Sequence, residues 1–492
     1  MKQMITRRWL VASMAAFGAA LGAAKSFAAG ILPASQNAAA GDLAGVALSE
    51  TKQSAASLQG RIIFRDDPRY QGLRDGTVWN ARKPGRFPEA IVMAETVDDV
   101  VAAVKLARAN GLQVGVRSTG HSWVAPYMRD HAILINMSKM QEISIDPVTK
   151  IAKVSPAVQG QILNHELRQQ QLMFPTGHCY GVGLGGYVLG GGLGWNSRVW
   201  GPACANLVAL DVVTAEGDLI HADEHSNTDY LWAARGAGPG FFGVAVRYYL
   251  ALHPLPAVQR ASSYVYPVEV FEPLYAWLRD ASPKFPKILE IFAIGRVMEG
   301  VPRLRVSGVA MGDSDEEVRA ALAVLDQCPV LAQAVTKSLD NHVQLPAMAD
   351  SAFSVDKFGS RFAVDNMWTS APSHELVPRL KEMFTVHPTP QSYALWQCWG
   401  EPRPLRDMAF SVQGEIYISC NVLYADPADD AKSDAWVTGH MKQLEDLATG
   451  SFINDENMAN RKSRYFSDAA AQRLAMLQDR YDPNRVFVSF LA

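Results

Sequence analysis

The sequence has few cysteines, no block of basic residues and, beyond its first residues, no long apolar run. The five cysteines form no C-x-x-C pair and lie far apart, which argues against a zinc site. A net charge of −3 without a basic block argues against nucleic acid as a partner. No apolar stretch of the mature chain approaches the length that spans a bilayer, so we expect no stable membrane insertion.

The N-terminal residues are typical of a bacterial export signal. Paired arginines at 7 and 8 precede an apolar run at 11–24 and the small residues Ala28 and Ala29. This order favours the twin-arginine route, and the apolar run is too short for a membrane anchor. We predict a signal peptide over 1–29, the twin-arginine export machinery as a partner, and a periplasmic or secreted protein that is exported folded.

Two further features concern the mature chain. Residues 30–58 are rich in Ala, Gly, Ser, Gln and Asn, which predicts a disordered leader. An odd number of cysteines in an exported protein predicts at least one thiol outside any disulfide. Whether the four cysteines other than Cys179 form disulfides stays open at this point: Cys204, Cys328, Cys398 and Cys420.

Periodicity divides the rest of the chain into an α/β part and a part that is richer in strands. The first part carries a helix that Thr96 caps and Asn110-Gly111 ends, and a helix over 159–171. Its expected strands are 112–116, 132–136, 143–145, 207–214, 219–222 and 243–252. After residue 255 we expect a helix at 315–325, a long alternating strand at 409–424, and a terminal helix at 469–480.

The alternating strand has one polar face, which is either solvated or lines a substrate site. The residues of that face are Ser411, Gln413, Glu415, Tyr417, Ser419 and Asn421.

A glycine-rich segment spans 177–194. Glycine loses much backbone entropy on folding, so such a run indicates that something bulky lies close to the chain. Residues 181–186 match G-x-G-x-x-G, but no strand-to-helix context and no acid about 20 residues on accompany them, which argues against a nicotinamide dinucleotide site. His221 and His225 are four apart in a polar turn, where a solvated loop is favoured over metal ligation.

Two nucleophilic side chains lie in or next to loops of small residues, where a ligand can come close to the backbone. His121 ends the turn Arg117-Ser118-Thr119-Gly120, whose backbone N–H groups suit a pyrophosphate. Cys179 lies in the glycine-rich loop itself. Together they suggest a large cofactor that is gripped by the protein.

The ordered motifs make the resemblance specific. The chain resembles the berberine bridge enzyme-like flavoproteins of the vanillyl-alcohol oxidase or PCMH superfamily. The motifs that carry it are Arg-x-x-Gly-His-Ser at 117–122, Gly-x-Cys-x-x-Val-Gly-x-Gly-Gly at 177–186, Gly-Gly-Gly-Leu-Gly-Trp-x-Ser-Arg at 190–198, Asn-Leu at 206–207, Val-Thr-Ala-Glu-Gly at 213–217 and Arg-Tyr-Asp-Pro-Asn-Arg-Val-Phe at 480–487.

The resemblance implies an α+β fold with three parts. A PCMH-type FAD-binding domain of two α/β subdomains would cover 59–255. A substrate domain with a large antiparallel sheet flanked by helices would cover 256–450. Residues 451–492 would return to the FAD domain.

The resemblance also implies FAD that is covalently bound at two positions. His121 would bond the 8α-methyl and Cys179 the C6 carbon of the isoalloxazine. The small residue Val182 goes with oxidase behaviour in this family. The other residues expected to bind the cofactor are Arg117, Ser118, Thr119, Gly120, Ser122, Gly183, Gly186, Gly190, Gly192, Val244 and Asn484.

Departures from the family pattern leave the catalytic base open. Thr119 replaces a usual glycine, and Phe452 stands where many members carry an active-site tyrosine. Candidates for the base are Tyr417, Glu415, Gln413 and Glu401, each of which also has a plain structural interpretation. Aromatics that could line a pocket for a ring-bearing substrate are Trp195, Trp396, Trp399 and Tyr417.

We therefore predict an enzyme, an FAD-dependent oxidase of a small alcohol, lactol, phenol or amine. A C–H beside an O–H or N–H would give hydride to flavin N5, and oxygen would be reduced to hydrogen peroxide. Two alternatives stay open. One is a periplasmic dehydrogenase that passes electrons to a carrier protein, and the other is a flavin-holding binding protein without turnover.

Overall fold

The structure is a computed structural model that describes residues 57–179, 181–343 and 359–491. The predicted signal peptide and all but the end of the predicted leader lie outside the described residues. Within the described part, no helix is both long and apolar enough to cross a membrane.

A four-stranded sheet opens the fold, in the order β1-β2-β4-β3. Its strands are β1 (Ile62–Phe64), β2 (Ala90–Met93), β4 (Ala132–Asn136) and β3 (Gln113–Arg117). Strand β4 pairs in parallel with both β2 and β3. The connection from β2 to β3 is helix α3 (Val97–Ala109), which begins at a capping box between Thr96 and Asp99. The predicted helix and strands are confirmed here to within one residue at each bound.

A five-stranded antiparallel sheet follows, in the order β5-β6-β10-β8-β9. Its strands are β5 (Ile143–Asp146), β6 (Ile151–Val154), β10 (Val244–Ala251), β8 (Leu207–Val213) and β9 (Leu219–Ala222). Helices α4 (Gly160–Arg168), α5 (Leu184–Leu189) and α7 (Thr228–Ala234) supply residues to the core of this part. A short pair of strands, β7 (Leu172–Met173) and β11 (His253–Pro254), lies where the chain leaves this part.

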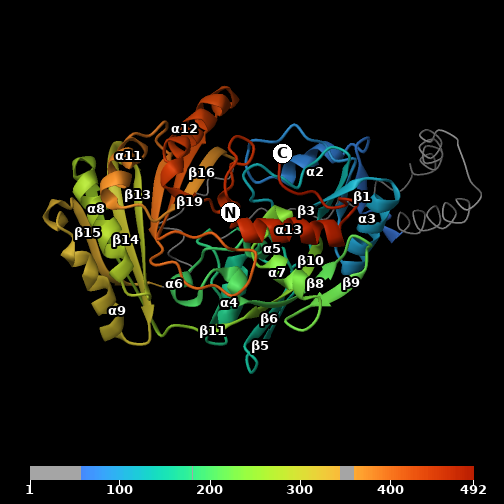
Figure 1. The fold of residues 1–492 in the computed structure, drawn as a ribbon, viewed down its shortest axis with the longest axis horizontal. Helices are drawn as coiled ribbons and strands as arrows, with labels where there is room; N and C mark the ends of the chain where they lie inside the picture. Colours follow the sequence, from blue (N-terminus) through green and yellow to red (C-terminus); the bar gives the residue numbers. More distant parts are fainter. Residues whose placement is uncertain (1–56, 180, 344–358, 492) are drawn as a thin grey trace, which may run out of the picture. The chain divides into compact units, whose positions relative to one another are not determined.

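The largest sheet has eight strands, all paired antiparallel, in the order β15-β12-β14-β13-β17-β18-β16-β19 (Figure 1). They are β15 (Thr336–His342), β12 (Val258–Pro267), β14 (Val301–Gly312), β13 (Leu289–Met298), β17 (Tyr393–Cys398), β18 (Ile416–Tyr424), β16 (Arg361–Thr369) and β19 (Ala448–Gly450). The predicted α+β class, with a large antiparallel sheet flanked by helices, is confirmed.

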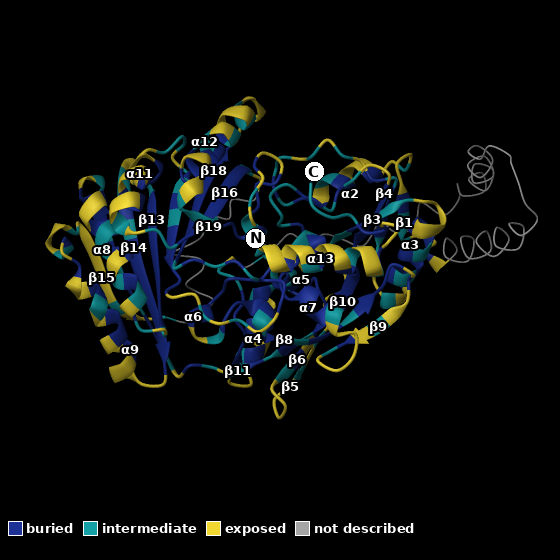
Figure 2. Cartoon of the chain, viewed as in Figure 1, coloured by how far each residue is buried: buried dark blue, intermediate teal, exposed yellow. Residues whose placement is uncertain are grey.

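Helices cover one face of this large sheet, which we call the outer face. They are α8 (Phe271–Ala281), α9 (Asp315–Leu322), α11 (Ser373–Thr385) and α12 (Asp430–Gln443). Their apolar residues share one core with alternate strand residues such as Ile291, Ala293, Trp396 and Ile418. The helices are exposed on the side away from the strands, whereas the strands of the sheet are mostly buried, apart from the exposed edge strand β15 (Figure 2). The residues that alternate with this core therefore form the inner face.

The chain returns to the first sheet at its end. Helix α13 (Asp468–Tyr481) is followed by residues that bond both sides of Val114 in β3. The Val114 N–H donates to the Val486 carbonyl at 2.7 Å, and the Val488 N–H donates to the Val114 carbonyl at 3.0 Å. The predicted domain boundaries themselves stay predictions.

The long strand predicted over 409–424 is wrong in its first half, because only Ile416–Tyr424 is a strand. The backbone N–H groups of Ala409 and Phe410 donate to the carbonyls of Trp232 and Arg235, at the end of α7. These bonds tie residues 409–410 to the other part of the chain instead of to a neighbouring strand. Alternation of polar and apolar residues alone does not distinguish the two arrangements.

Candidate active site

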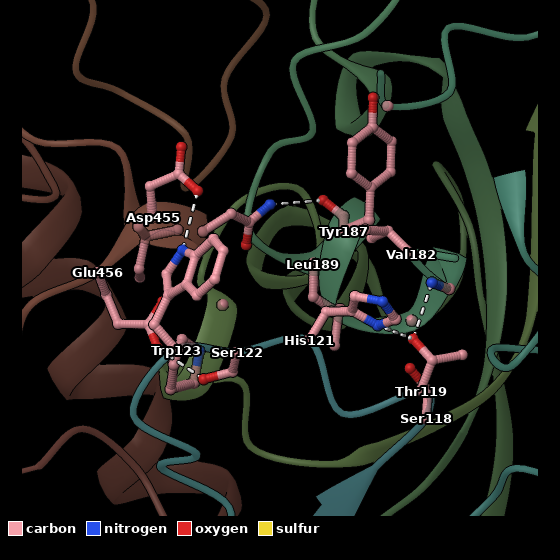
Figure 3. Close-up of a pocket in the computed structure, with 18 of the residues that line it drawn as sticks. Ser118, Thr119, His121, Ser122, Trp123, Val182, Tyr187, Leu189, Asp455 and Glu456 are labelled. Atoms are coloured by element: carbon pink, nitrogen blue, oxygen red, sulfur yellow. Dashed lines mark hydrogen bonds between the residues drawn. The ribbon is translucent and has the colours of Figure 1, made fainter. Parts of the chain in front are cut away.

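One cavity brings together the loop after β3, the glycine-rich loop and the inner face of the large sheet. Eleven of the predicted site residues line it: Arg117, Ser118, Thr119, Gly120, His121, Ser122, Cys179, Val182, Gly183, Gly186 and Tyr417. The two predicted nucleophiles, far apart in sequence, therefore face the same space. Figure 3 shows His121 with Thr119, Val182 and the acids of the C-terminal segment around it.

Arg117 stabilises the backbone of the loop after β3, which we call the first loop. Its guanidinium donates to the carbonyls of Thr77, Ser118 and Thr119 and to the Asn136 side chain, at 2.8 to 3.1 Å. Gly120 has φ +79°, and a Cβ there would lie 2.1 Å from the Thr77 carbonyl oxygen, so glycine is required.

Arg117 binds carbonyl groups of this turn. The N–H groups of the turn, in contrast, are available to another acceptor. The backbone N–H groups of residues 118–122 donate to no residue in the described ranges. Consecutive N–H groups around a left-handed residue form an anion-binding nest, so this loop suits a pyrophosphate.

Thr119 links the two loops. Its Oγ1 accepts a hydrogen bond from the Gly183 N–H at 2.8 Å and lies 3.1 Å from His121 Nδ1. The His121 ring stacks on Trp79, with ring centroids 5.4 Å apart. Burial, and then the charge of Arg117, lowers the pKa of His121 to about 4. The imidazole is therefore neutral at neutral pH and keeps a nucleophilic lone pair.

The glycine-rich loop has two kinds of glycine. Gly186 lines the cavity, and a Cβ there would meet no atom within 4 Å, so a side chain at this position would project into open space. Gly190 and Gly192 do not line the cavity; a Cβ on them would collide with Asn454 and Tyr187. These two glycines therefore admit the protein's own side chains rather than a ligand.

Two other predicted cofactor residues lie away from the cavity. Val244 is fully buried in the core between α3 and the sheets, and Asn484 is exposed in the turn after α13. The four cysteines other than Cys179 are buried, and the five, all within the described residues, form no disulfide with one another. Cys179 is exposed at the cavity wall.

A hydrogen-bonded pair stands on the side of the cavity formed by the large sheet. Tyr417 on β18 donates its hydroxyl to Asp455 Oδ2 in a short hydrogen bond. The other Asp455 oxygen accepts from the Trp123 indole N–H at 3.2 Å. Burial raises the pKa of Asp455, and burial followed by the charge of Asp455 raises that of Tyr417. The pair therefore joins a phenol to a carboxyl group that readily takes up a proton.

Glu456, next to Asp455, joins the same segment to the first loop. Its Oε1 accepts from the Ser122 hydroxyl at 2.6 Å and from the Val124 N–H at 3.4 Å. Glu456 is 3% exposed, and burial raises its pKa to about 8. It is thus a neutral acid at neutral pH, held beside the residue that follows His121.

The other three predicted base candidates do not line the cavity. Glu415 forms an ion pair with Arg279 at 2.7 Å, and Gln413 accepts from the Trp399 indole at 3.0 Å. Glu401 is exposed. Of the predicted pocket aromatics, Tyr417 lines the cavity, whereas Trp195, Trp396 and Trp399 do not. The lining aromatics are instead Trp79, Trp123, Tyr127, Tyr187, Phe241, Tyr248, Phe292, Phe362, Tyr393, Tyr417, Phe452 and Phe487.

Sequence reasoning missed Asp455, Glu456 and Trp123. The signal available was the pair of adjacent acids that begins three residues after Phe452, close to the place where the family pattern breaks. A buried acidic pair in a segment of low charge is a candidate for proton chemistry.

The fold and these loops define an α+β flavoprotein with a PCMH-type FAD-binding part. The family model described as FAD binding domain matches residues 88–223. FAD-linked oxidoreductase nodO of Hypoxylon pulicicidum is 35% identical over 441 residues, which cover 86% of this chain and 95% of that protein. The solved structure of BBE-like 1 from Physcomitrella patens has a TM-score of 0.76 at 20% identity, covering 89% of this chain and 97% of that one.

The chain belongs to the FAD-linked oxidoreductases, and its fold is that of the berberine bridge enzyme-like structures. It is an enzyme of this class, and the predicted cofactor FAD is confirmed. A further relative, (R)-6-hydroxynicotine oxidase of Paenarthrobacter nicotinovorans, is 32% identical over 209 residues, or 42% of this chain and 45% of that protein.

The residues present fit FAD. The nest at 118–122 offers unpartnered N–H groups for a pyrophosphate, and Gly186 leaves open space where a ring system would lie against the backbone. A neutral histidine and an exposed thiol flank that space.

Proposed function

We propose that the chain is an oxidase whose FAD is tethered by both His121 and Cys179. Its substrate would be a small, ring-bearing alcohol, lactol, phenol or amine, and oxygen would be reduced to hydrogen peroxide. The observation that carries the proposal is the Tyr417–Asp455 pair, which lines the same cavity as the two nucleophiles. When bound, FAD supplies the hydride acceptor and the route of electrons to oxygen.

Tyr417 and Asp455 would move the substrate proton in the step that breaks the C–H bond. The Tyr417 oxygen accepts the O–H or N–H proton while its own proton passes to Asp455 Oδ2. Before the reaction, the Asp455 carboxylate is stabilised by two donors, Tyr417 and Trp123. Afterwards Asp455 is neutral, which is the form that its burial favours. The negative charge of Asp455 is therefore neutralised, and no negative charge is left on Tyr417.

The cavity wall supports a ring-bearing substrate. Phe292, Tyr393 and Phe452 line it from three different segments, and Tyr417 lies 5.9 Å from Phe452 between ring centroids. Aromatic walls of this kind orient planar groups by offset or edge contacts. They also exclude water from the reacting C–H bond.

Val182 and the relatives support oxygen as the acceptor. Val182 lines the cavity three residues after Cys179, with a small side chain where the family pattern associates valine with oxidases. One relative is (R)-6-hydroxynicotine oxidase. A dehydrogenase that passes electrons to a carrier protein is the alternative, and it would produce no peroxide under air.

The N-terminal signal supports export as part of this function. We propose that twin-arginine machinery carries the chain, folded around its cofactor, to the periplasm or outside the cell. Fractionation of cells that produce Arg7→Lys/Arg8→Lys chains tests this. The wild-type protein should be outside the cytoplasm and the variant inside; the same location for both would contradict export by this route.

The test of the proposed function is a panel of aryl alcohols, lactols, phenols and amines, added to the yellow protein without oxygen. An oxidase substrate should bleach the flavin absorption, and admission of air should restore it with release of one peroxide per turnover. Bleaching without peroxide would favour the dehydrogenase. Absence of bleaching by every class would leave a binding protein and contradict the proposal.

A further inference from the structure

Three arginines share one end of the inner face of the large sheet. Arg296 on β13 lies directly opposite Arg303 on β14, and Arg305 lies opposite Ile294, one inner-face position along. They belong to the inner face because their neighbours Ile291, Ala293, Leu304 and Val306 are part of the outer-face core. Like charges placed directly opposite on a sheet are destabilising, so this arrangement needs a compensating charge.

The described part of the chain supplies no such compensation. None of the three guanidiniums forms an ion pair with an acid there, and Arg305 Nε donates to the Ser263 hydroxyl at 2.9 Å. Arg296 Nε is buried without a hydrogen-bond partner among the described residues. Burial, and then the charge of Arg296, lowers the pKa of Arg305. A buried donor without an acceptor costs free energy, which a bound anion would recover.

Nearby groups do not neutralise the cluster. Glu290 is on the same face of β13, but it lies at the other end and its Oε2 is 3.4 Å from His178. His387, which the Arg296 charge reaches, has a pKa lowered to about 4 by burial and by that charge. Its buried Nε2 also has no partner among the described residues. Because this nitrogen is a donor or an acceptor depending on the tautomer, it adds a second unsatisfied polar atom at this end of the sheet.

Arg296 lies next to the cavity wall in the register of the sheet, although none of the three arginines is itself a lining residue. Phe292, Gln397 and Tyr417 are register partners in one row across β13, β17 and β18, and all three line the cavity. Arg296, Tyr393 and Asn421 form a second such row, in which Tyr393 and Asn421 line the cavity. The rows are separated by four residues along each strand, or roughly 13 Å at about 3.3 Å per residue. Arg296 on β13 is also two strands away from Tyr417 on β18, which adds roughly 10 Å across the sheet.

We propose that Arg296, Arg303 and Arg305 form a subsite for an oxyanion, a carboxylate or a phosphate monoester, at the far end of the substrate. The substrate is then an anionic molecule that extends from Tyr417 to Arg296, whose Cα positions lie roughly 16 Å apart by this register. This inference rests on the proposed function for the chemistry at Tyr417, but the subsite itself is tested by binding alone.

Binding to the yellow holoenzyme is measured by calorimetry and by the change in visible flavin absorption, without turnover. The probes are phenylalkanoates of increasing chain length, the uncharged amide of each and the matching phosphate monoesters. We expect one chain length of the acid or of the phosphate to bind about tenfold or more tightly than its amide. The probe series that binds more tightly, the carboxylates or the phosphate monoesters, identifies the oxyanion.

The variants Arg296→Gln and Arg305→Gln should each abolish most of that preference. Arg296→Lys and Arg305→Lys keep the charge and should retain part of it, which separates loss of recognition from loss of folding. Arg108→Gln, at an exposed position at the end of α3, removes one positive charge elsewhere and should leave the preference unchanged.

Two results would overturn the subsite. One is equal binding of charged and uncharged probes at every chain length, including no binding of either. The other is a preference that survives both glutamine variants. If instead the preference depends on the arginines while no acid is ever oxidised, the subsite stands and the proposed oxidase activity fails.

Discussion

Replacing Glu456 by glutamine tests the electrostatics of the buried acid that joins the C-terminal segment to the first loop. Burial raises the pKa of this carboxyl from 4.5 to about 8 in the folded chain. Between these values the unfolded chain releases the proton and the folded chain retains it, so wild-type stability falls as pH rises. Glutamine keeps the acceptor for Ser122 but carries no titrating proton.

The size of the effect follows from the width of that pH window. Each pH unit is worth about 1.4 kcal/mol, so the wild type should lose on the order of 5 kcal/mol relative to E456Q between pH 4.5 and pH 8. The loss should be complete above the folded pKa. Urea unfolding of both proteins, followed by tryptophan fluorescence at several pH values, measures the difference. A difference in unfolding free energy that does not change with pH would refute the reasoning.

Three further substitutions test the contacts of the cavity. Tyr417→Phe should lower kcat by roughly 10²–10⁴-fold without changing the flavin content, since it removes the hydroxyl that accepts the substrate proton; steady-state rates and the flavin-to-protein absorbance ratio measure both. Val182→Ile should slow the reaction of the pre-reduced enzyme with oxygen in rapid mixing, while anaerobic reduction keeps its rate. Thr119→Val should cost about 1–3 kcal/mol of unfolding free energy because the Gly183 N–H loses its acceptor, whereas Thr119→Ser keeps it. Equal stability of the two Thr119 variants would argue against that bond.

Local patterns predicted the elements that present the two loops. The capping box at Thr96 and Asp99 set the start of α3, and turn residues set the bounds of β8 and β9. These signals are short-range, so they survive in a single sequence. The position of the loop after β3 follows from these signals, because the loop begins where the strand ends.

The rest of the site depends on contacts between distant residues. Alternation placed Glu415 and Tyr417 on the same face, but it could not show that Arg279 binds the first and Asp455 the second. Likewise, the glycine run indicated close approach without showing that Gly190 and Gly192 face the protein's own side chains. Such partners come from elements hundreds of residues apart in some cases, and periodicity carries no information about them.

The double tether of the cofactor is tested most directly by the absorption spectrum of acid-precipitated protein. The comparison needs the wild type, His121→Ala, Cys179→Ala and the double variant, each prepared with FAD. We expect the yellow colour to stay with the pellet in the wild type and in both single variants, and to appear in the supernatant of the double variant. Release of the flavin from the wild-type pellet, or from either single variant, would contradict attachment at two positions.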